Sequence, residues 1–285
     1  MKKLTEDNYY SKEANKEYCS ASQLKEFLNC KGRFACEAKA IAIINGEYEE
    51  EIEPPTEKAF LIGSYVDCAL LTPDELPKFI ENHPELFSSR GATKGQLKAE
   101  FQIANKMIER AKQDKFFMRT LEGDHQSILT GEIEGLKFKA KLDVLNPKWI
   151  VDLKTTKSIT QTYWNPLTKQ RETFIEFFDY ITQAAIYREL VKQNYGYGNI
   201  PFYISAISKE KEPDIAVIQI PNEMIDERLE FLKPYIENVK LLKEGKATPC
   251  KCGNCDYCRK TKVLTKPILL QDLYGETEIE GNEQI

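Results

Sequence analysis

The sequence predicts a protein of the α/β or α+β class, with helices on both faces of a central β-sheet. Helical patterns fill the N-terminal part of the chain. Three short strand-like runs follow, and helices then alternate with two further strands. Strands in this order form a sheet whose two faces must be covered by helices. The 285 residues, 41% of them hydrophobic, can form one large domain with a sizeable core.

Apolar periodicity and capping residues predict five helices. Ser20 to Ser22 can cap the first of them, ahead of the apolar positions Leu24, Phe27 and Leu28. The Glu-rich stretch 46–56 predicts an exposed loop that ends at two prolines. The expected helices span residues 20–44, 56–71, 97–119, 174–193 and 225–243.

Runs rich in β-branched and apolar residues predict five strands. Turn signals at Glu134-Gly135 and Asn146-Pro147 separate the first three strands from one another. The expected strands span residues 125–135, 136–145, 149–156, 201–207 and 215–220.

Charge is distributed unevenly along the chain. Acidic residues outnumber basic ones by 45 to 40, which leaves a formal charge of −5. Residues 272–285 contain five acids and no Lys or Arg, so residues 1–271 are neutral in sum. We expect a single domain over 1–271 and a disordered acidic tail over 272–285. A uniformly basic surface is excluded, but a local basic channel is not, because local potential governs phosphate binding.

The sequence shows no sign of membrane insertion or export. No run approaches the ~18 consecutive apolar residues of a membrane span, and the N-terminus has no apolar signal segment. We therefore expect a cytoplasmic protein without a membrane partner. Its eight cysteines are then more suited to packing, metal binding or reactivity than to disulfides.

Asp143, Asp152 and Lys154 form the most informative cluster. Asp152 and Lys154 lie two residues apart in one predicted strand, so their side chains share a face, and the hairpin places Asp143 beside them. Two carboxylates favour a hard divalent cation such as Mg²⁺ or Mn²⁺. A nearby lysine can activate an attacking water. The cluster predicts metal-assisted phosphodiester hydrolysis; the alternative is a buried ion-pair network.

This cluster resembles the catalytic core of the PD-(D/E)xK nucleases. Gln183 and Tyr187 are similar to the Gln-x-x-x-Tyr motif of the RecB-type group. Gly63 to Asp67 is similar to the Gly-x-x-x-His motif of that group, with Asp in place of His. Asp67 could instead be a helix cap or a salt-bridge partner.

The resemblance implies a restriction-endonuclease-like fold with a mixed central sheet flanked by helices. It implies catalytic roles for Asp143, Asp152, Lys154, Gln183 and Tyr187. It implies metal ligation by Asp67, Asp143, Asp152 and the backbone carbonyl of Leu153. Candidates for DNA contacts are Arg90 and Lys94, in the loop 88–95, and Thr155 and Thr156.

Within this superfamily the chain resembles phage and prophage exonucleases of the exodeoxyribonuclease VIII (RecE) type. The phrases FLIGSYVD, FKAKLDVLNPKWIVDLKTTKS, FFDYITQAAIYREL and AISKEKEPDIAVIQI carry the similarity, over roughly residues 18–262. It implies 5′→3′ digestion of linear duplex DNA in phage-type recombination, in the cytoplasm of a bacterial host cell. It also implies a single-strand annealing partner and a homo-oligomeric ring. The alternatives are a Cas4-like or structure-specific endonuclease, and a non-catalytic DNA-binding protein on the same fold.

Four cysteines crowd into the segment 250–258. Cys252, Cys255 and Cys258 have a spacing suited to one metal centre. Together with Cys30 they resemble the cysteine set of the iron–sulfur nucleases Cas4 and AddB, which implies a [4Fe–4S] cluster. A local Zn²⁺ site that also uses Cys250 is an alternative, and so is the absence of a metal. We expect Cys19, Cys36 and Cys68 to be packing residues.

Overall fold

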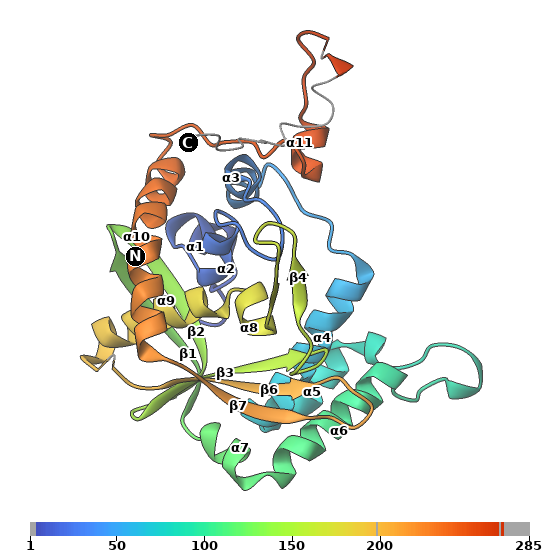
Figure 1. Ribbon diagram of the computed structural model, residues 1–285. Coiled ribbons are helices and arrows are strands. Elements are labelled where there is room, and N and C mark those ends of the chain that lie inside the picture. Colours follow the sequence, from blue (N-terminus) through green and yellow to red (C-terminus); the bar gives the residue numbers. More distant parts are fainter. Residues whose placement is uncertain (1–3, 198, 268, 271–285) are drawn as a thin grey trace, which may run out of the picture.

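The computed structural model describes residues 4–197, 199–267, 269 and 270, and it confirms the predicted class. In the described part of the chain, a mixed five-stranded sheet has the order β1-β2-β3-β6-β7, and helices cover both of its faces (Figure 1). The strands are β1 (Asp124–Ile133), β2 (Leu136–Asn146), β3 (Trp149–Thr156), β6 (Phe202–Ser208) and β7 (Ile215–Ile220). The predicted acidic tail, 272–285, lies outside the described residues.

The pairing of β2 with β3 is short, and this matters for the site. β1 and β2 pair along their length through a turn at Glu134-Gly135, where φ is 48° and 71°. β2 and β3 are also antiparallel, but their pairing covers only residues 144–146 of β2. β3 pairs in parallel with β6, and β6 pairs antiparallel with β7. The two strands therefore diverge at Asp143, which leaves room there for side chains.

Residues 12–45 form three short helices, so the single helix predicted over 20–44 is wrong. Between the second and third helices the backbone turns at Lys31 and Gly32, with φ of 54° and 66°. A right-handed helix cannot continue through two left-handed residues. A Cβ at Gly32 would lie 2.7 Å from Pro166 Cδ, so the turn needs glycine. The three helices are α1 (Lys12–Glu17), α2 (Ala21–Lys25) and α3 (Glu37–Asn45).

A second group of helices covers the opposite face of the sheet. Val66, Phe101 and Met107 of this group pack against Val144 and Val151 of the strands. The group contains α4 (Pro54–Leu71), α5 (Leu76–Asn82), α6 (Ala99–Gln113) and α7 (Lys115–Thr120).

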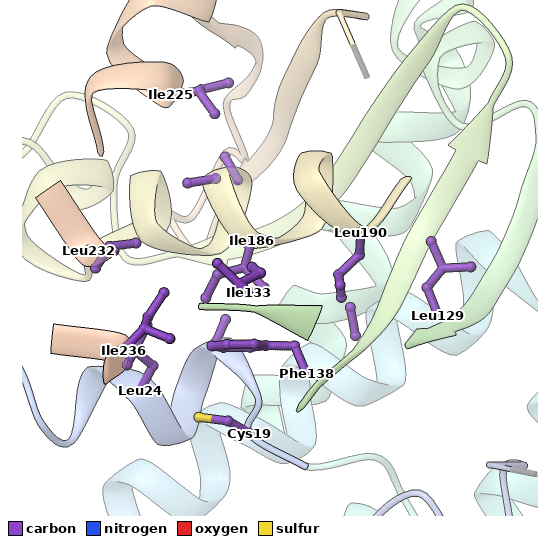
Figure 2. Close-up of a cluster of buried hydrophobic side chains, with 14 of the residues drawn as sticks. Cys19, Leu24, Leu129, Ile133, Phe138, Ile186, Leu190, Ile225, Leu232 and Ile236 are labelled. Atoms are coloured by element: carbon purple, nitrogen blue, oxygen red, sulfur yellow. The ribbon is translucent and has the colours of Figure 1, made fainter. Parts of the chain in front are cut away.

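The other face carries the larger core. Figure 2 shows Ile186 and Leu190, with Leu232 and Ile236 beyond them, gathered around Phe138 of β2. All five side chains are fully buried. The helices on this side are α8 (Phe174–Phe177), α9 (Tyr180–Tyr195) and α10 (Asn222–Lys243), together with α1 to α3.

An aspartate interrupts each of two predicted helices. The helix expected over 97–119 divides at Asp114, whose carboxylate accepts a hydrogen bond from Phe117 N–H at 2.9 Å and so caps α7. The helix expected over 174–193 divides at Asp179, which has a left-handed φ of 52° and caps α9 through Thr182 N–H.

Several short elements are absent from the sequence-based prediction, because runs of so few residues have no measurable period. They include α1, α5, a separate hairpin of β4 (Tyr163–Asn165) and β5 (Gln170–Glu172), α11 (Asp256–Lys260), and 3₁₀ helices at Pro73–Glu75, Pro84–Leu86 and Gly91–Thr93. In Figure 1, α11 lies next to α3, which brings Cys258 to Cys36 although 222 positions separate them in the chain.

Candidate functional site

One cavity of about 560 Å³ contains the predicted catalytic cluster. Its wall includes Asp67, Asp143, Asp152, Lys154, Gln183 and Tyr187. These side chains come from α4, β2, β3 and α9, which are far apart in the sequence. The structure therefore brings together all six side chains that the motifs single out.

Regular backbone geometry explains how each side chain reaches the cavity. Asp152 and Lys154 project from the same face of β3. Gln183 and Tyr187 are one turn apart on α9 and share a face of that helix. Asp67 lies one turn after Gly63 on α4, where a Cβ at the glycine would be 3.6 Å from Thr155 Oγ1. The helix therefore crosses β3 in close contact.

Asp152 lies at the centre of the hydrogen-bond network. Its side chain is buried, and its Oδ1 accepts hydrogen bonds from Lys154 Nζ and Gln183 Nε2, both at 2.8 Å. Its Oδ2 is 2.7 Å from Lys154 Nζ but accepts no well-directed hydrogen bond from any described residue. Lys154 Nζ therefore lies close to both carboxylate oxygens, and Gln183 contacts one of them.

Asp143 lies beside this pair and is held by the backbone of β3. Its Oδ2 accepts a hydrogen bond from Leu153 N–H at 2.9 Å. Burial and the neighbouring negative charge of Asp152 raise the pKa of Asp143 to about 7. Burial and the charge of Asp143 likewise raise the pKa of Asp67 well above its usual value. These carboxyl groups therefore ionise less readily than exposed ones.

Lys154 and Tyr187 both retain their protons in this setting. Burial acts to lower the pKa of Lys154, but the charges of Asp152 and Asp143 outweigh it and raise that pKa well above its usual value. Burial, followed by the charge of Asp152, raises the pKa of Tyr187. The cavity thus presents an ammonium and a phenol hydroxyl as hydrogen-bond donors.

The donor set fits a divalent cation. Lys141, also in the wall, is paired with Glu6, so if Asp67, Asp143 and Asp152 are all ionised, the ammonium of Lys154 balances only one of these three charges. Carboxylate oxygens on several elements around one cavity are the ligands that Mg²⁺ prefers. Oδ2 of Asp152 is such an oxygen: it is buried beside Lys154 and accepts no well-directed hydrogen bond from a described residue, so a bound cation would supply a further partner.

Two residues near the site, Tyr180 and Lys25, have no counterpart in the sequence-based prediction. The ammonium groups of Lys154 and Lys25 each lie 5.1 Å from the centre of the Tyr180 ring. Lys25 is buried and donates to the carbonyl of Phe178 at 3.0 Å, and burial lowers its pKa to about 8. Tyr180 could have been suspected, because it precedes Gln183 by one helical turn. Lys25 carries no sequence signal, since only the fold brings α2 to this position.

The four DNA-contact candidates differ in position. Arg90 and Lys94 are exposed and adjoin the 3₁₀ helix Gly91–Thr93, in a loop that projects from the body of the molecule (Figure 1). They are absent from the wall of the cavity that contains Asp152. Thr155 is half-buried under α4, and the Thr156 hydroxyl is buried and donates to the carbonyl of Ser158 at 3.3 Å.

A second centre is formed by Cys36, Cys252, Cys255 and Cys258. Their sulfur atoms all lie within 4.8 Å of one another, with 3.5 Å between Cys36 and Cys258 and 3.9 Å between Cys252 and Cys258. All four are free thiols. Burial acts to raise the pKa of Cys252, but backbone hydrogen bonds at Asn254 and Cys255 outweigh it and lower that pKa to about 7. The group is well suited to metal binding.

Cys36, and not the expected Cys30, lies with the three C-terminal cysteines, and it also packs in a small buried cluster with Ala38 and Cys258. Cys36 immediately precedes α3, and the start of that helix is bound to the C-terminal segment. Ala38 N–H donates to the carbonyl of Cys250 at 3.0 Å, and Cys250 N–H donates to Glu37 Oε2 at 2.8 Å. The Cys30 thiol instead donates to the carbonyl of Lys25.

The other cysteines lie outside the four-sulfur group. Cys250 itself is exposed and does not join it, contrary to the alternative of a local zinc site built on this residue. Cys19 is buried in the core, as Figure 2 shows. Cys68 is half-buried and interacts with Thr72.

The four cysteines could hold either Zn²⁺ or an iron–sulfur cluster. A tetrahedral Zn²⁺ with Zn–S bonds of about 2.3 Å places its sulfurs about 3.8 Å apart. The two shortest separations, 3.5 and 3.9 Å, are close to that value, and all others lie within 4.8 Å.

Comparison with known proteins supports the architecture. Residues 20–261 match a PDDEXK-like domain of unknown function, DUF3799. The chain belongs to this PDDEXK-like family. Among solved structures, the PDDEXK-like chain is similar to a protein from Eubacterium rectale described as a "putative exonuclease". That protein is 37% identical, with a TM-score of 0.85, and the match covers 97% of this chain and 100% of the other. No curated protein matches.

The family and the structural match together establish the PD-(D/E)xK nuclease fold that the sequence motifs predict. The family match covers most of the single domain expected over residues 1–271, although the boundaries of that domain stay a prediction. Among the helices of the described residues, none has the length and hydrophobicity needed to cross a membrane.

Proposed function

We propose that this protein is a Mg²⁺- or Mn²⁺-dependent deoxyribonuclease that digests linear duplex DNA from its ends. One observation carries the proposal: Asp67, Asp143, Asp152, Lys154 and the Gln-x-x-x-Tyr pair all line a single cavity. The alternative without catalysis, a buried ion-pair network, pairs Lys154 with Asp152 and gives Asp67 and Asp143 no ammonium of their own among the described residues.

We assign the metal ligands as Asp67, Asp143, Asp152 and the backbone carbonyl of Leu153. Leu153 N–H points to Asp143, and the carbonyl of a strand residue points to the same edge as its N–H, so this oxygen also faces the gap between β2 and β3. Bound here, Mg²⁺ would polarise the scissile phosphate and lower the pKa of the attacking water.

The remaining side chains position the reactants. Gln183 and Lys154 both donate to Oδ1 of Asp152 and so fix the orientation of that carboxylate at the cavity wall. The ammonium of Lys154 would orient the attacking water and offset the charge that develops on the phosphate. The Tyr187 hydroxyl, protonated because of burial, would donate a hydrogen bond to the phosphate or to its water.

Exonuclease action, rather than endonuclease action, is supported by the match to the protein described as a "putative exonuclease". The motifs that resemble RecE-type enzymes extend the proposal to 5′→3′ polarity, to a role in phage-type recombination, to a single-strand annealing partner and to a ring of several copies. The DNA-contact roles of Arg90, Lys94, Thr155 and Thr156 belong to the same proposal.

Digestion of three DNA substrates tests the function. Linear duplex labelled at the 5′ end, the same duplex labelled at the 3′ end, and a closed circle are incubated with Mg²⁺ or with EDTA. We expect degradation of the linear DNA only, dependent on Mg²⁺, with the 5′ label released first. Cleavage of the circle would favour the endonuclease alternative. Binding without cleavage in either metal would favour the non-catalytic one.

We also propose that the four-cysteine centre holds Zn²⁺ in a structural role. The tetrahedral sulfur spacing supports this choice, and the [4Fe–4S] cluster implied by the resemblance to Cas4 and AddB becomes the alternative. The ion would link α3 to α11 and so join the two ends of the domain.

A further inference from the structure

Three lysines on one face of β2 hold the N-terminal segment of the chain. Lys137, Lys139 and Lys141 alternate along the strand, so their side chains share a face. Lys137 Nζ is 2.9 Å from Glu17 Oε1, and Lys139 Nζ is 2.7 Å from Asn15 Oδ1. Lys141 Nζ is 2.9 Å from Glu6 Oε1.

The next position on this face is Asp143, so Lys141 is the lysine closest in the strand to the metal-binding carboxylates. Lys141 and Glu6 both line the catalytic cavity, whereas Lys137 and Glu17 do not. Lys139 is also absent from the wall, and it is almost completely buried, with 1% of its surface exposed. Of the three lysines, Lys141 alone therefore faces the substrate space.

Another anion can replace Glu6 as the partner of Lys141 with little loss of free energy. The side chain of Glu6 is 62% exposed, against 17% for Lys141. An ion pair with an exposed partner contributes little to stability, so another anion can displace Glu6. Phosphate oxygens carry the same charge as the carboxylate and accept the same ammonium hydrogen bonds.

The wall next to this pair also suits a nucleotide. Tyr10 lines the same cavity and is 72% exposed as a residue, and its ring packs edge-on against Tyr9 with 4.9 Å between the ring centres. Exposed aromatic rings beside lysines are typical of surfaces that bind nucleic acid strands, because bases stack on them while the phosphates meet the ammonium groups.

We propose that Lys141 binds the phosphate next to the scissile one in the DNA strand, and that the carboxylate of Glu6 occupies this phosphate position when DNA is absent. The inference rests on the proposed nuclease function. DNA would exchange one ion pair for another at Lys141, and the N-terminal segment would be released from the cavity at Glu6.

Equilibrium binding of a short duplex tests the proposal, with Ca²⁺ in place of Mg²⁺ and a gel to establish that the DNA stays intact. Lys141→Gln should weaken binding about tenfold, and the slope of log K against log salt should become shallower by about one, as expected for one lost phosphate contact. Lys141→Arg should retain most of the affinity, because arginine also binds phosphate.

A substitution of Glu6, the acidic partner of Lys141, tests the proposal more specifically. Glu6→Gln should tighten binding about two- to fivefold, the range expected for release of one exposed ion pair. It should have no effect in a Lys141→Gln background. Glu17→Gln is the matched control: it makes the same charge change on the same segment, outside the cavity, and should leave the affinity unchanged.

The outcomes separate this inference from the proposed function. If wild-type protein binds and digests duplex DNA while Lys141→Gln keeps its affinity and salt slope, Lys141 is not a phosphate site. Equal effects of Glu6→Gln and Glu17→Gln would show that Glu6 does not occupy the phosphate position. If the wild-type protein neither binds nor digests DNA, the proposed function fails and this inference fails with it.

Discussion

Asp152 is the residue on which the geometry of the cavity depends most. Lys154 and Gln183 both contact its Oδ1, and Lys154 Nζ also lies 2.7 Å from its Oδ2. The same carboxylate contributes to the raised pKa values of Asp143, Asp67 and Tyr187. A change at this one position therefore alters both the metal site and the protonation of its neighbours.

Asp152→Ala should reduce Mg²⁺-dependent digestion of DNA to below about a tenth of the wild-type rate, because removal of a ligand weakens the ion that polarises the phosphate. Asp152→Glu should retain part of the activity, since it keeps a carboxylate. Glu227→Ala, at an exposed position on α10, serves as the control and should have no effect. Activity close to wild type in Asp152→Ala would contradict the assignment.

The raised pKa of Asp143 predicts a pH-dependent stability of the metal-free protein. Because its pKa in the folded protein is about 7, the folded state binds this proton more tightly than the unfolded state, which has the ordinary value of 3.8. Ionisation then costs stability as pH rises from about 4 to 7. In EDTA, Asp143→Asn should be more stable than wild type at pH 8 by a few degrees of Tm, and this difference should shrink at pH 5.

Thermal unfolding at both pH values checks this prediction. Added Mg²⁺ should raise the Tm of wild-type protein at pH 8 and leave that of Asp143→Asn nearly unchanged, because ligand binding stabilises only the state that binds it. A Tm difference that is the same at pH 5 and pH 8 would show that Asp143 titrates normally.

At the scale of secondary-structure elements, the cysteine centre joins α3 to α11. Cys36 and Cys258 are 222 positions apart in the chain, and their sulfurs are 3.5 Å apart. An ion that bridges them would remove much of the conformational freedom of the unfolded chain. The contribution of this centre should therefore be to stability, with little direct effect on chemistry at the phosphate.

Cys36→Ser should empty the centre and lower Tm, whereas Cys30→Ser should keep the metal, because Cys30 lies outside the group of four sulfurs. Metal analysis of protein purified without oxygen should give about one Zn²⁺ per chain and no visible absorption. A brown protein with four irons per chain would identify a [4Fe–4S] cluster instead. Loss of metal in Cys30→Ser but not in Cys36→Ser would overturn the ligand assignment.

At the scale of the whole molecule, a chain of net charge −5 is proposed to act on a polyanion. Binding must then depend on local positive charge, at sites such as Lys141 and Lys154, and on release of counterions. A ring of several copies would hold DNA by enclosure and would need less basic surface on each chain.

Light scattering of the purified protein checks the proposed ring. The mass should be a multiple of the chain mass of 32.9 kDa, and it should be independent of protein concentration in the micromolar range. A mass of one chain, together with digestion that continues along the same DNA molecule, would exclude the ring as the source of processivity.

Sequence alone predicted the five strands of the sheet, most of the long helices and the residues that meet around Asp152, because these depend on regular spacing within single elements. Asp152 and Lys154 share a face as residues two apart on a strand must, and Gln183 and Tyr187 share one as residues four apart on a helix must. The interruptions at Asp114 and Asp179 were missed, since the apolar pattern continues across them.

Only the tertiary structure decided which distant residues meet. Cys30 and Cys36 are equally plausible partners for the C-terminal cysteines by spacing, and the turn at Gly32 together with the anchoring of α3 to Cys250 selects Cys36. The approach of Glu6 to Lys141 has no local signal either. Such contacts depend on how elements pack across the chain, and a periodic pattern within one element carries no information about its partners.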